Sequence, residues 1–181
     1  MNMENPKNDG AQSVESFPPR TCSAVLFLDV DGVLNASGKT TQRFHGRLGI
    51  CPDMMARLLR ILRETGCKVV LYSTWRKHPE HIEHLRENWG TLGNDRLAGM
   101  TPVLDEQSGA CLWTAKSRWT EIAAWLAQNP EVKHFVILDD DGDMAHLLPH
   151  LVQTDNFEGL TDRITEDVIR RLNVRTLRPA D

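Results

Sequence analysis

Three segments of the chain are apolar at every position, which is typical of strands covered on both faces. They are Ala24–Leu28, Val69–Tyr72 and Phe135–Leu138, and a weaker apolar pair follows at Leu151 and Val152. Strands with one face in water alternate apolar and polar residues instead. The pattern therefore predicts a central parallel sheet that lies between two layers of helices.

Between these strands, apolar residues recur at the spacing of an amphipathic helix. The segments with this pattern are Pro52–Thr65, Pro79–Trp89 and the stretch from Trp119 to Leu126. A last helix is predicted for Thr165–Leu172, with Thr165 as its N-cap. Strands that alternate with helices through short connections indicate an α/β fold of three layers.

The composition of the chain limits the kinds of protein that it can be. The chain has 181 residues, 40% of them hydrophobic and 25% charged, and a formal net charge of −4. Residues 1–20 are polar and predict a disordered tail, so that residues 21–181 form one domain. No apolar run approaches the roughly 20 residues that span a bilayer, and the start of the chain shows no signal peptide. With four widely spaced cysteines, we expect a cytoplasmic protein with reduced thiols and no membrane association.

Acidic residues follow two of the predicted strands. Asp29 and Asp31 come directly after the first strand, with Gly32 behind them, and the run Asp139–Asp143 follows the third. Either motif alone is also a common turn sequence. Because ligands collect at the carboxyl ends of parallel strands, the two motifs together predict a site there. Hard oxygen ligands gathered from two strands favour Mg²⁺ over zinc.

Hydroxyls and cations complete the candidate site. Ser73 and Thr74 follow the second strand, and a hydroxyl there can donate to a phosphoryl oxygen or simply cap a turn. Lys116 and Arg118 stand before the third strand, at the start of a predicted helix, where a cation is electrostatically disfavoured unless an anion binds. Either of them could be the phosphate-binding cation, or both could be ordinary surface residues.

The order of these motifs resembles the haloacid dehalogenase-like (HAD) phosphatase superfamily. The resemblance consists of D-x-D-G after the first strand, Ser/Thr after the second, Lys/Arg before an apolar strand, and paired aspartates after that strand. It spans about residues 24–172, and the stretches F-L-D-V-D-G-V-L-N, S-T-W-R and I-L-D-D-D also resemble small HAD domains found in some bacterial RNA-repair proteins. It implies a three-layer Rossmann-like fold and a Mg²⁺-dependent phosphohydrolase.

The resemblance also implies roles for individual residues. Asp29 would attack phosphorus and become an aspartyl phosphate, and Asp31 would act as general acid and then as general base. Ser73 and Lys116 would be the other catalytic residues. Mg²⁺ would be held by Asp29, the backbone carbonyl of Asp31 and Asp139. Asp140 supports the metal in the first-ranked assignment, and Asp143 is the alternative.

The gaps between motifs are short. Asp29 and Ser73 lie 44 positions apart and Ser73 and Lys116 lie 43 apart, which leaves no room for a large cap domain. The segments 36–50 and 90–113 are expected to be loops around an open mouth. An open site suits a bulky phosphorylated substrate such as a nucleic-acid end. The predicted substrate contacts are Thr74, Trp75, Arg76 and Arg118, although a place in the core is the simpler interpretation of Trp75. The sequence specifies no oligomeric state.

Two other functions and one other site are compatible with parts of the sequence. The chain could be a catalytically idle HAD fold that serves as a binding or regulatory module, which the intact Asp29 and Asp31 argue against. A receiver-type signalling domain also gathers aspartates and a lysine, but it places its acidic pair and phosphoacceptor in a different order. His78, His81 and His84 could bind a transition metal, although a solvated helix face is the simpler interpretation of this spacing.

Overall fold

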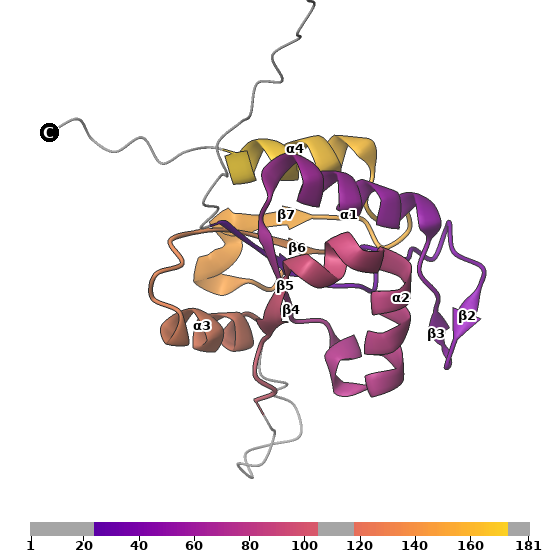
Figure 1. The fold of residues 1–181 in the computed structure, drawn as a ribbon, viewed down its shortest axis with the longest axis horizontal. Helices are drawn as coiled ribbons and strands as arrows, with labels where there is room; N and C mark the ends of the chain where they lie inside the picture. The colour runs from indigo at the N-terminus through magenta and orange to yellow at the C-terminus, as the bar shows by residue number, and fades with distance from the viewer. Residues whose placement is uncertain (1–23, 105–117, 174–181) are drawn as a thin grey trace, which may run out of the picture.

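A computed structural model describes residues 24–104 and 118–173. Within them, one sheet has the strand order β5-β4-β1-β6-β7, and its neighbouring strands are all parallel. These strands are β5 (Leu97–Met100), β4 (Lys68–Leu71), β1 (Ala24–Leu28), β6 (His134–Asp139) and β7 (Leu151–Gln153). Helices cover both faces of the sheet (Figure 1). The predicted three-layer α/β fold with a central parallel sheet is confirmed, while the predicted tail of residues 1–20 lies outside the described residues.

The central strand, β1, is buried along its whole length. Its alternate residues Ala24, Leu26 and Leu28 belong to a core shared with helices α1 (Pro52–Thr65), α2 (Pro79–Arg96) and α4 (Asp162–Asn173). Val25 and Phe27 point to the other face, into a core with α3 (Arg118–Gln128) and the short 3₁₀ helix η2 (Ala145–His150). A strand between two apolar layers gains from apolar residues at every position.

Helix α1 spans the predicted range because both of its ends are marked by the sequence. Pro52 suits a first helical turn, and Gly66 ends the helix in the left-handed conformation at φ 66°. The predicted helix Pro79–Trp89 is the first part of α2, which continues to Arg96 beyond a break at Gly90. The break lies at the first residue after the predicted helix.

The predicted N-cap of the last helix was wrong. Helix α4 begins at Asp162, and the hydroxyl of Thr161 accepts the Ile164 N–H at 3.3 Å. Thr165 is buried one turn later, where its hydroxyl donates to the Thr161 carbonyl at 2.8 Å. Thr161 therefore occupies the cap position, and it is an equally good cap residue on sequence grounds.

The two predicted loops contain short strands. The first holds a hairpin of β2 (Arg43–Phe44) and β3 (Arg47–Leu48). Its turn residues His45 and Gly46 both have positive φ, 46° and 80°, as the tight turns of such hairpins require. The second holds β5, at the edge of the sheet. Among the described residues neither segment builds a large cap domain, and none of their helices is long and apolar enough to cross a membrane.

Candidate active site

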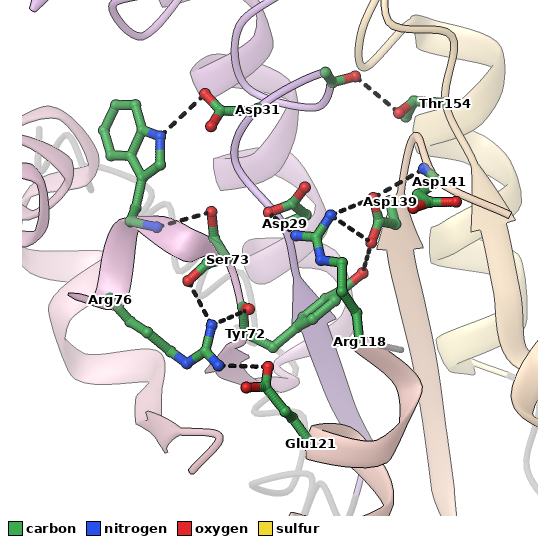
Figure 2. A network of polar contacts seen from close by, with 12 residues as sticks. Asp29, Asp31, Tyr72, Ser73, Arg76, Arg118, Glu121, Asp139, Asp141 and Thr154 are labelled. Carbon is green, nitrogen blue, oxygen red and sulfur yellow. Dashed lines mark hydrogen bonds and ion pairs between the residues drawn. The ribbon is translucent and has the colours of Figure 1, made fainter. Parts of the chain in front are cut away.

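Three neighbouring strands bring the predicted site together at one edge of the sheet. Asp29 follows β1, Ser73 follows β4 after Tyr72, and Asp139 is the last residue of β6. Because β1 pairs in parallel with both β4 and β6, the carboxyl ends of the three strands meet. Figure 2 shows their side chains converging, with Arg118 reaching in from the start of α3.

Asp29 is the most constrained of these groups. Its side chain is 2% exposed, and its Oδ1 lies 2.6 Å from Arg118 Nη2. This ion pair lacks hydrogen-bond geometry, so that Oδ1 has no hydrogen-bond donor among the described residues. Burial raises the pKa of Asp29 to about 6, and Asp139 raises it further, while Arg118 and the Ser73 hydroxyl act to lower it. A buried carboxylate held by a single ion pair is suited to meet a further cation or an electrophile.

Asp139 is the second anchor of the site. Its Oδ2 accepts a short hydrogen bond from the Tyr72 hydroxyl, and its Oδ1 accepts the Asp141 N–H at 3.0 Å. Arg118 Nη1 lies 3.4 Å from Oδ2, and the guanidinium stands over the Tyr72 ring at 5.2 Å. Burial raises the pKa of Asp139 and, together with the nearby carboxylates, raises that of Tyr72. Arg118 thus bridges two buried aspartates, which in turn raise its own pKa against the effect of burial.

Three carboxylates are placed where they could hold a metal ion. Asp29, Asp139 and Asp140 each offer an oxygen, and these oxygens lie within 4.8 Å of one another. The chain turns behind them at Gly32, where φ is +71° and an added Cβ would stand 2.3 Å from Asp140 Cγ. Only glycine allows Asp140 to approach so closely. The possible ligand atoms are all carboxylate oxygens, two of them from the buried residues Asp29 and Asp139, so the residues present fit Mg²⁺.

Asp31 points away from this cluster, toward three donors. Its Oδ1 accepts the Trp75 indole N–H at 3.0 Å and the Asn35 amide at 2.9 Å. Its Oδ2 pairs with Arg47 Nη1 at 2.7 Å. Asn35 also accepts the Gly32 N–H at 3.1 Å and donates to the Leu48 carbonyl at 3.1 Å, which joins the loop to the hairpin. The carboxylate is therefore held in one orientation.

Of the two hydroxyl residues that follow β4, Ser73 lies in the site and Thr74 lies at the surface. Ser73 is fully buried, accepts the Trp75 N–H at 3.3 Å and begins the short 3₁₀ helix η1 (Thr74–Lys77). Thr74 is exposed. Ser73 lies close enough to Asp29 to lower the pKa of that carboxyl. Its hydroxyl therefore belongs to the site, while the contacts of Thr74 do not link it to the other candidate residues.

Trp75 and Arg76 were predicted as substrate contacts, and the structure turns both toward protein. Trp75 is fully buried, with its indole bound to Asp31. The Arg76 guanidinium, 3% exposed, pairs with Glu121 Oε2 at 2.5 Å and donates to the Ser73 carbonyl at 2.8 Å. A base cannot stack on a ring that has no exposed face, and a buried, paired guanidinium has few donors left for phosphate. The structure gives both side chains contacts within the protein, and their role as substrate contacts stays a prediction.

The two candidate cations have different outcomes. Arg118 contacts both Asp29 and Asp139, as described above. Lys116 lies outside the described residues, so its predicted role stays a prediction. Asp143 is not among the carboxylates that lie together at the strand ends, which are those of Asp29, Asp139 and Asp140. Its backbone N–H donates to Asp141 Oδ1 at 3.0 Å.

Sequence reasoning missed three contributors to the site: Asn35, Arg47 and Tyr72. Asn35 had a signal, since it follows the D-x-D-G motif closely. A tyrosine at the end of an otherwise aliphatic strand was a weaker signal, because a buried hydroxyl needs a partner. No sequence signal pointed to Arg47, because only the hairpin brings this residue near Asp31.

The fold and the acidic strand ends define a domain of the HAD superfamily. More specifically, residues 25–164 match the family described as HAD domain in Swiss Army Knife RNA repair proteins. The match covers well over half of the 181 residues, so the chain belongs to this family. The resemblance inferred from the sequence is thereby confirmed. No curated protein matches the chain.

Proposed function

We propose that the chain is a Mg²⁺-dependent phosphomonoesterase that forms an aspartyl phosphate on Asp29. The observation that carries the proposal is the buried Asp29 carboxylate, paired with Arg118 and grouped with the carboxylates of Asp139 and Asp140 at the ends of neighbouring strands. Such a group is poised to act as a nucleophile once the charge around it is neutralised. Membership of a HAD family supports the same reaction class.

Each residue has a role in two half-reactions. An oxygen of Asp29 attacks phosphorus, the bond from phosphorus to the leaving oxygen breaks, and Asp31 gives that oxygen a proton. Asp31 then takes a proton from water, whose oxygen attacks phosphorus and releases Asp29. Ser73 donates to a phosphoryl oxygen, and Arg118 offsets negative charge at Asp29.

Asp29, Asp139 and Asp140 are the residues that would hold the metal. When bound, Mg²⁺ supplies the positive charge that lets a carboxylate approach a phosphate group. Tyr72 fixes Asp139 through its hydroxyl, which positions one of these ligands.

The substrate that we favour is a phosphorylated nucleic-acid end. The family description refers to RNA repair proteins, and the described residues include no large cap domain that would enclose a small metabolite. A phosphate at the end of a long chain can reach such a site while the rest of the chain stays outside.

The test is a phosphatase assay with 3′- and 5′-phosphorylated oligonucleotides, mononucleotides, sugar phosphates and phosphopeptides. We expect activity that chelation abolishes and Mg²⁺ restores. Asp29→Asn should lower kcat by roughly 10³-fold or more, because it removes the nucleophile. Asp95→Asn, an exposed residue of α2, is the matched control and should keep full activity.

Three outcomes would contradict parts of the proposal. Near-wild-type turnover by folded Asp29→Asn would reject the covalent mechanism, and full activity after exhaustive chelation would reject the metal. Absence of activity on every substrate class would favour a binding or regulatory module.

A further inference from the structure

Aromatic rings and imidazoles of the hairpin, of Trp75 and of the start of α2 lie in contact with one another. Phe44 of the hairpin stacks on His84 of α2, with ring centroids 4.0 Å apart and an interplanar angle of 10°. The His81 ring lies 5.0 Å from that of Trp75 and 5.1 Å from that of His78. The proposed phosphatase reaction uses none of these histidines.

His81 is the residue of this group that needs an explanation. It is 3% exposed, and neither of its ring nitrogens has a hydrogen-bond partner among the described residues. An imidazole always carries at least one N–H, and leaving a buried polar group unpaired is energetically unfavourable. Buried polar groups in native proteins are nearly always satisfied, so an unmet partner is to be expected here.

Two neighbours offer ligand atoms that point to the identity of this partner. A nitrogen of His81, a nitrogen of His78 and a carboxylate oxygen of Glu80 all lie within 4.8 Å of one another. His78 Nδ1 and Glu80 Oε1 are 3.7 Å apart. Ligands of one tetrahedral zinc ion lie roughly 3.3 Å apart, given metal–ligand distances near 2 Å. Small side-chain rotations would therefore close the set around an ion.

We propose that His78, Glu80 and His81 form a second metal site, which binds a first-row transition-metal ion such as Zn²⁺. Two imidazoles and one carboxylate suit Zn²⁺ better than Mg²⁺, which prefers the all-oxygen cluster at the strand ends. Three protein ligands leave one position for a water molecule.

The ion would fasten the first turn of α2 to the segment that carries Trp75. Since the Trp75 indole holds Asp31, the second site would stabilise the scaffold behind the proposed acid/base residue. The site does not depend on the proposed phosphatase activity, because its ligands take no part in that reaction.

The test uses the full chain, stripped of metal under reducing conditions and titrated with Zn²⁺ in excess Mg²⁺, which occupies the acidic cluster. Calorimetry should report about one Zn²⁺ per chain, and Co²⁺ should give the visible absorption of a tetrahedral site without thiolate charge-transfer bands. His78→Ala and Glu80→Gln should each weaken Zn²⁺ binding by at least about tenfold. Both residues are partly exposed, so these variants are expected to fold.

His84→Ala is the matched control, because His84 lies one turn further along the same helix and outside the ligand set. It should bind Zn²⁺ like the wild type. Zn²⁺ should raise the Tm of the wild type and of His84→Ala, and it should leave the Tm of His78→Ala and of Glu80→Gln unchanged. The proposal is overturned if the wild type binds no Zn²⁺, if the Co²⁺ spectrum shows thiolate ligands, or if His78→Ala and Glu80→Gln keep wild-type affinity.

Discussion

At the scale of single residues, Trp75 connects the hydrophobic core to Asp31, the proposed acid/base residue. Its ring is fully buried, but its indole N–H reaches one oxygen of Asp31 at 3.0 Å. A hydrogen bond to a charged group contributes about 1.5–3 kcal/mol, roughly twice as much as one between neutral groups. Trp75 is therefore a positioning residue for the proposed acid/base group.

Replacing Trp75 by Phe tests this role, because it removes the donor and keeps an aromatic ring. We expect kcat to fall by roughly tenfold or more while KM changes by less than about twofold, since Asp31 acts in the transition state rather than in substrate binding. Steady-state kinetics on the best substrate from the activity screen would measure both constants.

Trp89→Phe is a matched control for this substitution. Trp89 is also buried, at 2% exposure, and its indole donates to Asn94 at 3.3 Å, away from the strand ends. It should lose stability to a similar extent and keep its kcat. An equal loss of kcat in the two variants would mean that Trp75 acts through stability alone.

Asp29 makes the stability of the metal-free protein depend on pH. Its pKa is about 6 in the folded protein, against an ordinary value of 3.8. A raised pKa means that the folded state binds the proton more tightly, so the contribution of Asp29 to stability is complete below about pH 3.8 and is lost as the pH rises through about 6. Asn at this position does not titrate.

We therefore expect the free energy of unfolding of Asp29→Asn, relative to wild type, to increase between about pH 4 and pH 6 and then to level off. The full change is up to about 3 kcal/mol, from the size of the pKa shift. Urea unfolding of both proteins in chelator, at several pH values across this range, would measure it. A difference that is flat with pH would show that Arg118 cancels the effect of burial on this carboxylate, and one that falls with pH would show that Arg118 outweighs it.

At the scale of elements, the helices and strands that were predicted from the sequence are those with a clear local sequence pattern. The buried strands β1, β4 and β6 are visible as apolar runs because helices cover both of their faces. Helix α1 was predicted to its ends because Pro52 and Gly66 mark them. Asp29, Ser73 and Asp139 could be placed together without a structure, since parallel strands end at one edge.

The missed elements depend on contacts that are distant in sequence. Strand β5, at the sheet edge, is only partly buried, and Gly99 interrupts its short apolar run. The hairpin has two residues in each strand, and it is held by the tight turn His45-Gly46 and by the bond from Asn35 to Leu48. No periodicity can develop over such short segments. Arg47 reaches Asp31 only because this hairpin forms.

At the scale of the whole molecule, the charge distribution bears on the proposed substrate. The chain carries a formal net charge of −4, so no global positive field attracts nucleic acid. Contacts to a phosphate backbone would have to come from single cations near the site. The hairpin adjoins the site through Arg47, which is engaged with Asp31, and it presents Arg43 as an exposed cation.

We expect a 3′- or 5′-phosphorylated oligonucleotide to be hydrolysed with a higher kcat/KM than its mononucleotide, because neighbouring phosphates can meet such cations. Each contact between a cation and a phosphate of a single strand should contribute roughly −0.7 to the slope of log kcat/KM against log salt concentration. One or two such contacts therefore imply that kcat/KM falls about three- to sevenfold between 50 and 200 mM salt.

Arg43→Ala should reduce both the advantage in kcat/KM of the oligonucleotide and its salt dependence, while leaving kcat/KM for the mononucleotide unchanged. Arg63→Ala, an exposed arginine on α1, has the same effect on net charge and should leave both substrates unchanged. If the oligonucleotide and mononucleotide are hydrolysed with equal efficiency at every salt concentration, the chain is better described as a phosphatase of small molecules, because an open site without backbone contacts gives a longer chain no advantage.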